Sequence, residues 1–169
     1  NSLTTLRTPL VARVISVGEV EDCPFLVQLH RPGKTLREVL TRLGKLVAPK
    51  LPLQLASYVT HQAMRALQHV YRQQPASDAK VDCSHRDISP EHLLIGFDGT
   101  VQLTGLGLSE AGDGAPSSGT SLSDPWGRQP PERAWGRARD AAVDVFAMGI
   151  VALIIIFSVL QHASSRGSG

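Results

Sequence analysis

The order of hydrophobic and polar positions predicts strands near the start of the chain. Two runs rich in β-branched and aliphatic residues, Leu10–Ile15 and Phe25–Leu29, are separated by the acidic, turn-prone stretch Gly18–Pro24. Apolar runs bounded by turn residues are typical of short strands. We therefore predict an antiparallel pair of strands, followed by a break in the pattern at Arg31–Lys34.

The apolar spacing then becomes helical. Thr35 is a suitable N-cap for a helix from Leu36 to about Leu46, and Pro52 suits the first turn of a second helix that ends near Gln73. The first helix has an apolar face of Leu36, Val39, Leu40 and Leu43. The second has a longer apolar stripe, which we interpret as core: Leu55, Val59, Ala63, Ala66, Leu67 and Val70.

A β-hairpin is predicted in the middle of the chain. After a short strand at Val81–Ser84, the apolar runs Leu93–Ile95 and Val101–Leu103 flank the turn dipeptide Asp98-Gly99. Such a hairpin would hold the loops at its two ends side by side.

The last third of the chain combines a segment poor in apolar residues with a strongly apolar one. Leu108–Gln129 is rich in Gly, Ser and Pro, and we expect it to be the least ordered internal segment. Val145–Leu160 is almost wholly apolar, and at ~1.5 Å per residue a helix there spans roughly 24 Å, short of the ~30 Å hydrocarbon core of a bilayer. We predict a buried core helix rather than a membrane span, and a disordered tail at His162–Gly169.

Composition and charge narrow the class of protein. A chain of 169 residues with 42% hydrophobic content can form one domain with its own core. A net charge of +2 gives no reason to expect nucleic acid or an anionic membrane as a partner. Cys23 and Cys83 are isolated, which favours buried thiols in a reducing compartment. With no N-terminal signal peptide, we expect a cytoplasmic location.

The candidate chemistry lies in two short motifs around the predicted hairpin. The first is His85-Arg86-Asp87-Ile88-Ser89-Pro90-Glu91-His92, and the second is Gly105-Leu106-Gly107. Together they resemble the H-R-D-L-x-x-x-N catalytic loop and the D-F-G metal-binding loop of eukaryotic-type protein kinases. Pro131-Glu132 resembles the end of the A-P-E motif, and Asp144-Val145-Phe146 resembles the start of the central helix of the large lobe. The intervals between these motifs are similar to those of the family, and the H-R-D-I-S-P form of the loop is closest to bacterial serine/threonine kinases.

This resemblance implies an α+β, protein-kinase-like fold. It consists mainly of the helical large lobe, with the last strands of the small lobe. Residues 1–30 would be the remnant of the small lobe, residues 31–161 the large lobe, and residues 162–169 the tail. Leu108–Gln129 would be the activation loop.

The resemblance also implies a role for individual residues. Asp87 occupies the position of the base that accepts the substrate hydroxyl proton, and Arg86 would pair with a phosphorylated residue of the activation loop. His85, Glu132 and Asp144 would be structural. At the ATP site, Gln28 would occupy the gatekeeper position. The hinge, which lines the adenine through backbone groups, would be Leu29, His30 and Arg31.

Three positions depart from the family pattern where the chemistry is most demanding. Ser89 replaces a common Lys, His92 replaces the Asn that binds the second metal ion, and Gly105 replaces the Asp that bridges both ions. Imidazole is a poor ligand for Mg²⁺, which prefers oxygen. Glu91 and Asp98 lie nearby in sequence, but neither is an obvious substitute. The family implies ATP and Mg²⁺ as cofactors, and these substitutions predict weakened binding.

Three functional hypotheses follow. The first is a catalytically impaired pseudokinase that binds or regulates a partner protein. The alternative is an active serine/threonine kinase completed by residues outside this chain. A second alternative is a membrane-anchored, kinase-like sensor with its span at Val145–Leu160. The first hypothesis fits the substitutions at His92 and Gly105 best.

Overall fold

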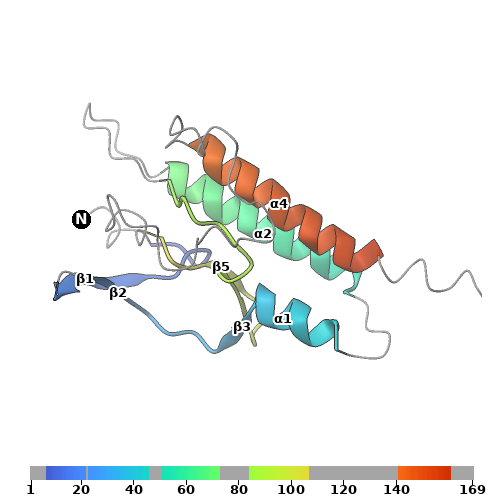
Figure 1. Ribbon diagram of the computed structural model, residues 1–169, viewed down its shortest axis with the longest axis horizontal. Coiled ribbons are helices and arrows are strands. Elements are labelled where there is room, and N and C mark those ends of the chain that lie inside the picture. Colours follow the sequence, from blue (N-terminus) through green and yellow to red (C-terminus); the bar gives the residue numbers. More distant parts are fainter. Residues whose placement is uncertain (1–6, 22, 46–50, 73–83, 107–140, 161–169) are drawn as a thin grey trace, which may run out of the picture.

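The computed structural model describes residues 7–21, 23–45, 51–72, 84–106 and 141–160. These residues form a two-stranded sheet, a three-stranded sheet, one short helix and two long helices (Figure 1). The activation-loop segment Leu108–Gln129, the predicted strand residues 81–83 and the tail lie outside the described residues. The division of the chain at residue 30 stays a prediction.

The first sheet consists of β1 (Val14–Val20) and β2 (Cys23–Gln28), which pair antiparallel with Val20 opposite Cys23. The predicted pair is confirmed, and the chain reverses within the predicted stretch Gly18–Pro24, but the turn is shorter than that stretch because both strands continue into it. Glu21 adopts a left-handed φ of 50°, so the chain reverses within two residues and the flanking residues stay extended. The predicted buried thiol at Cys23 is also wrong, since Cys23 is exposed.

Residues 10–12, predicted as the start of the first strand, pair elsewhere. The amide of Leu103 donates to the Leu10 carbonyl and the amide of Ala12 donates to the Leu103 carbonyl, both at 2.8 Å. Val11 forms an isolated parallel bridge with Leu103 and is 3% exposed. This short segment therefore joins the N-terminal part of the chain to the central hairpin.

The second sheet has the order β3-β4-β5 and contains the predicted hairpin. The hairpin strands are β4 (Leu93–Gly96) and β5 (Val101–Leu103). The sequence pattern did not predict β3 (Gly33–Thr35), which pairs antiparallel with β4. Helix α1 (Leu36–Leu43) follows at once, and its N-cap Thr35 forms the predicted cap, completed by Glu38 as a capping box.

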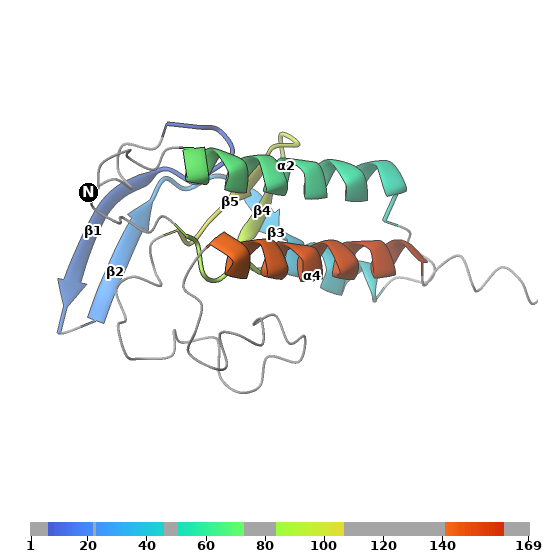
Figure 2. The same ribbon diagram turned by 90° about the horizontal axis from the view of Figure 1, so that it is seen from above.

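Two long helices lie side by side and pack against each other (Figures 1 and 2). They are α2 (Leu53–Arg72) and α4 (Ala141–Leu160). The predicted core stripe of α2 is buried except for Leu55, which is 37% exposed. Helix α2 also contacts β5, so the core lies between the helix pair and the hairpin.

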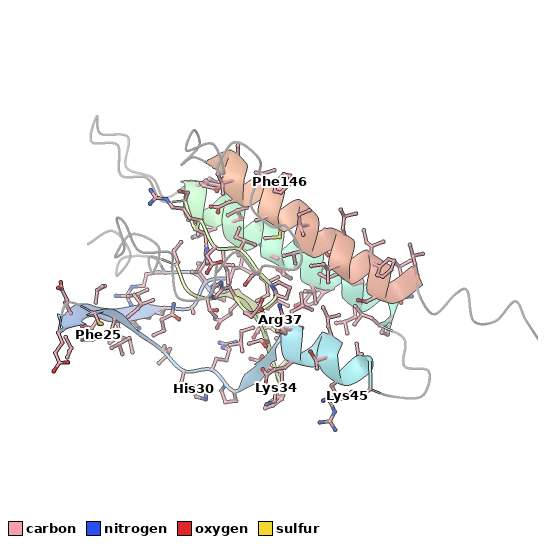
Figure 3. All side chains as sticks on the ribbon, in the orientation of Figure 1. Phe25, His30, Lys34, Arg37, Lys45 and Phe146 are labelled. Carbon is pink, nitrogen blue, oxygen red and sulfur yellow. The ribbon has the colours of Figure 1, made fainter. Side chains whose placement is uncertain are left out.

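The prediction that Val145–Leu160 is buried all round is wrong, because only one face of α4 is covered. Its buried residues are Val143, Asp144, Ala147, Met148, Val151 and Ile155. Figure 3 shows Phe146 on this helix, and its exposed large apolar residues are Val145, Phe146, Leu153, Ile156, Phe157 and Leu160. Among the described residues, α4 is the one helix long and apolar enough to cross a membrane, a test that core helices also pass. The covered face is the one that meets α2.

Candidate kinase-like catalytic loop and metal-ligand positions

Asp144 fixes the start of the loop formed by residues 85–92. Its carboxylate is fully buried and accepts hydrogen bonds from the amides of His85 at 2.5 Å and Arg86 at 2.6 Å. The hydroxyl of Tyr71 donates to the same carboxylate at 2.6 Å. Arg86 has a φ of 63°, a left-handed conformation that costs a residue with a side chain roughly 1–2 kcal/mol. The carboxylate therefore holds the loop in a shape that it would not adopt alone.

His85 connects this loop to the end of β5. The side chain is fully buried, and its Nε2 lies 2.7 Å from the carbonyl oxygen of Thr104. The Asp87 amide donates to Nδ1 at 3.4 Å, so the proton is on Nε2, which donates to Thr104. Burial lowers the pKa of His85, while the Thr104 bond opposes this shift. His85 is therefore a neutral structural bridge near pH 7, in the place predicted for it.

Asp87 and His92 meet at the centre of the candidate site. The Nδ1 atom of His92 donates to the backbone carbonyl of Asp87 at 2.6 Å and lies 3.6 Å from an Asp87 carboxylate oxygen. The Ser89 hydroxyl is 3.2 Å from the same nitrogen. Asp87 keeps 30% of its side chain exposed. The structure thus brings together the predicted base position and one of the two altered metal-ligand positions.

Gly105 and His92 complement each other in shape. Gly105 has a φ of 79°, a left-handed conformation that favours glycine and tolerates Asp or Asn. A Cβ atom placed on Gly105 would lie 2.8 Å from Cδ2 and 3.0 Å from Nε2 of His92. The imidazole therefore occupies the space that a side chain at position 105 would need. The next residue, Leu106, is 1% exposed in the core, as predicted for the Phe position of the motif.

The other predicted site residues are held by bonds that serve the fold. Ser89 is 2% exposed, and its hydroxyl supplies no positive charge at the position where the family commonly has Lys. The Arg86 side chain contacts the hydroxyl of Ser84 at 3.1 Å. Glu91 forms an ion pair with Arg37 of α1, and Asp98 forms one with Arg31 in the hairpin region. Both carboxylates are therefore engaged with arginines of the fold and not with the metal-ligand positions. Glu132 lies outside the described residues.

The residues of the predicted hinge bond to the first sheet and to the hairpin turn. The amide of Leu29 donates to the carbonyl of Arg13 at 2.9 Å, which continues the pairing of the first sheet. The Arg31 guanidinium bonds Asp98 at 3.0 Å and the Thr100 hydroxyl at 2.6 Å. The side-chain amide nitrogen of Gln28 is buried without a partner among the described residues. The role of Gln28, Leu29, His30 and Arg31 in holding adenine stays a prediction.

The donor set fits Mg²⁺ poorly. Within the described residues, no group of three or more His, Cys, Asp and Glu side chains could hold a metal ion. Of the family's two metal positions, one carries the imidazole of His92 and the other, Gly105, has no side chain. The carboxylate of Asp87 lies beside His92. Mg²⁺ requires several oxygen ligands at octahedral positions. The described residues therefore lack the oxygen ligands that a kinase metal site needs.

Two supporting residues were missed by the sequence reasoning. Tyr71 lies at the end of α2 and donates a hydrogen bond to the Asp144 carboxylate. Arg37, in the first turn of α1, forms an ion pair with Glu91 of the 85–92 loop. Tyr71 lies four residues after the core residue Leu67, so it continues the apolar stripe of α2 with a polar tip. That signal could have identified Tyr71, whereas no local pattern pointed to Arg37.

The comparisons with known proteins agree with this geometry. PknA of Corynebacterium glutamicum, a serine/threonine-protein kinase, is 31% identical over 128 residues, which cover 75% of this chain and 24% of the relative. PrkC of Bacillus subtilis, also a serine/threonine-protein kinase, is 28% identical over 151 residues, covering 89% of this chain and 21% of the relative. The chain thus spans less than a quarter of the length of these relatives. No protein-family model matches it.

A solved structure shows the same fold. The PknI kinase domain of Mycobacterium tuberculosis, crystallised as a cysteine-to-alanine mutant, superposes with a TM-score of 0.67 at 17% identity. The match covers 93% of this chain and 53% of that domain. The predicted α+β, kinase-like fold is therefore confirmed.

Proposed function

We propose that this protein-kinase-like domain, similar to those of bacterial serine/threonine kinases, binds or regulates a partner protein and transfers phosphate poorly or not at all. The observation that carries the proposal is the contact between His92 and Gly105. The imidazole occupies one metal-ligand position and blocks the space of the other. Phosphoryl transfer depends on positioning and on charge neutralisation around Mg²⁺, so both losses act on the same step.

The remaining parts of the site support a retained scaffold. The bonds from Asp144 to the amides of His85 and Arg86 keep the loop in shape. His85 is buried and bonded, and Leu106 is packed in the core. A domain that keeps this framework while losing its metal ligands is suited to presenting surfaces to another protein. We expect a partner or substrate of protein nature, no nucleic acid, and a cytoplasmic location.

Binding of ATP with and without Mg²⁺ tests the proposal. Isothermal calorimetry on the full-length protein should give ATP affinities that differ by less than about threefold between Mg²⁺ and EDTA, because the described residues at the metal positions supply too few oxygen ligands. The matched variant His92→Asn with Gly105→Asp should gain Mg²⁺ dependence. If Mg²⁺ tightens ATP binding by about tenfold or more in the unmodified protein, and Asp87→Asn removes that gain, the metal site is functional.

An active serine/threonine kinase is the second candidate function. It is favoured by Asp87, which keeps the base position, a partly exposed carboxylate and a well-held backbone. In that case, ligands from residues outside the described part of the chain would hold the metal. Glu110, which lies there, is the carboxylate to test. Loss of activity in Glu110→Gln, with retained folding, would favour this second candidate.

A further inference from the structure

A cavity beside the predicted hinge is separate from the candidate catalytic loop. It has a volume of about 750 Å³ and is lined by residues from three parts of the chain, within 7–13, 29–32 and 97–102. Neither Asp87 nor His92 lines it. We propose that this cavity docks an acidic segment of a partner protein, one that also carries a large apolar side chain.

The charges around the cavity favour an anionic occupant. Arg7 and Arg13 line it and are exposed, and no carboxylate of the described residues pairs with either of them. Asp98 is the one carboxylate in the lining, and its ion pair with Arg31 already balances its charge. Within the described part of the chain, two guanidinium groups are therefore left without a counter-charge. Guanidinium groups form strong bidentate hydrogen bonds with carboxylates.

The apolar side chains around the cavity favour a peptide over a small anion. Phe97 and Leu29 both line it, although 76% of Phe97 and 57% of Leu29 is exposed to solvent. Burying apolar side chains of this size stabilises a complex, and the fold itself leaves both of them uncovered. A phosphate or pyrophosphate ion would contact the arginines but could not cover these two residues. A peptide with carboxylates and an apolar side chain can satisfy both.

The walls of the cavity are held in place by hydrogen bonds between distant segments. The Gln102 side chain donates to the Pro9 carbonyl at 2.8 Å, and the amide of Phe97 donates to the Pro32 carbonyl at 3.2 Å. His30 lies on the connection between β2 and β3, which forms a further wall (Figure 3). The site is therefore largely preformed, which reduces the entropic cost of binding.

Selecting peptides that bind the immobilised protein tests the proposal. Random 12-residue peptides displayed on phage are selected on immobilised protein, and in parallel on two variants. The first variant is Arg7→Glu with Arg13→Glu. The second is the control Arg65→Glu, which reverses a charge on the exposed face of α2 away from the cavity. Circular dichroism melting confirms that each variant is folded.

We expect the selected peptides to be enriched in Asp and Glu together with Phe, Leu or Trp. A synthetic peptide from the selection should bind in fluorescence anisotropy, and the double arginine variant should weaken it at least tenfold. Phe97→Ser should weaken it as well, while Arg65→Glu should change it less than twofold.

Three outcomes would overturn the proposal. The first is no enrichment, or enrichment that is equal on the double arginine variant. The second is displacement of the peptide by pyrophosphate, which would identify a site for small anions. The third is self-association of the protein that the double variant abolishes, which would identify a second copy of the chain as the occupant. The proposal does not depend on catalytic activity, because none of its residues belongs to the 85–92 loop.

Discussion

At the scale of single residues, His92 and Gly105 are best understood as one paired change. A glycine at position 105 leaves room for the imidazole, and a Cβ atom there would lie 2.8 Å from the ring, so one of the two side chains would have to shift. His92 precedes β4 and Gly105 follows β5 at the open end of the hairpin, where Leu93 pairs with Leu103, so the pairing depends on the hairpin register. Reverting one position alone therefore disturbs the fold as well as the chemistry.

A double-mutant cycle tests this pairing through stability. Gly105→Asp alone should destabilise the protein by about 1–3 kcal/mol, because the new side chain meets the His92 ring. His92→Asn alone should cost less, and the combined variant should recover most of the loss, giving a coupling energy of at least about 1 kcal/mol. Urea denaturation of the four proteins measures it. Strict additivity would show that the two side chains do not compete for space.

His85 gives the fold a pH dependence of predictable sign. Burial lowers its pKa in the folded state below the ordinary value of 6.5. As the pH falls below about 6.5, the unfolded chain takes up a proton that the folded protein does not, so stability is lost by up to about 1.4 kcal/mol per pH unit. His85→Gln should therefore flatten the stability profile between pH 7 and pH 5. An equal slope in His85→Gln would rule out this role.

At the scale of elements, helix α4 has one covered face and one exposed apolar face. Its buried side chains meet α2, and the carboxylate of Asp144 at its start reaches the 85–92 loop. The helix is thus both a wall of the core and the anchor of the candidate site. Changes on its two faces should have very different effects.

A pair of adjacent substitutions separates the two faces of α4. Ile155 is 1% exposed, so Ile155→Asp should bury an unpaired carboxylate and cost several kcal/mol of unfolding free energy. Ile156 is 47% exposed, and Ile156→Asp should cost less than about 1 kcal/mol. The sequence predicted a helix buried all round, with Ile154 in the core. Ile154 is only half-buried. Equal losses at 155 and 156 in thermal melting would contradict the observed packing.

The elements that follow from local signals could be predicted, and those that depend on tertiary pairing could not. The cap at Thr35, the hairpin turn at Asp98-Gly99 and the stripe of α2 were visible in sequence. The short β3 was not, because three residues give no periodicity and its stability comes from pairing with β4. The exposed face of α4 was missed because a helix that is apolar all round carries no signal for which side is covered.

The candidate site divides in the same way. The motif identified Asp87 as kept and His92 and Gly105 as departures from the kinase pattern, and the resemblance implied a structural role for Asp144. It could not reveal that the His92 ring fills the space at Gly105, because that contact depends on three-dimensional register. Tyr71 joins the anchor from a helix far away in sequence, and only the packing of α2 against α4 brings it there.

At the scale of the whole molecule, the domain keeps a kinase-like framework with an altered catalytic centre and a separate, positively charged cavity. The framework depends on the helix pair and the hairpin, which hold the 85–92 loop through Asp144 and His85. The cavity is lined by other residues, from the segments 7–13, 29–32 and 97–102. The proposed docking and any phosphoryl transfer would therefore depend on different residues.

The most direct test of the central claim is a phosphoryl-transfer assay with radiolabelled ATP and Mg²⁺. It uses the full-length protein, so that any nucleotide-binding residues outside these 169 are present. We predict that the unmodified protein transfers no more phosphate than Asp87→Asn, and that His92→Asn with Gly105→Asp exceeds both single variants. The claim is contradicted if the unmodified protein phosphorylates itself or a substrate and Asp87→Asn abolishes that activity.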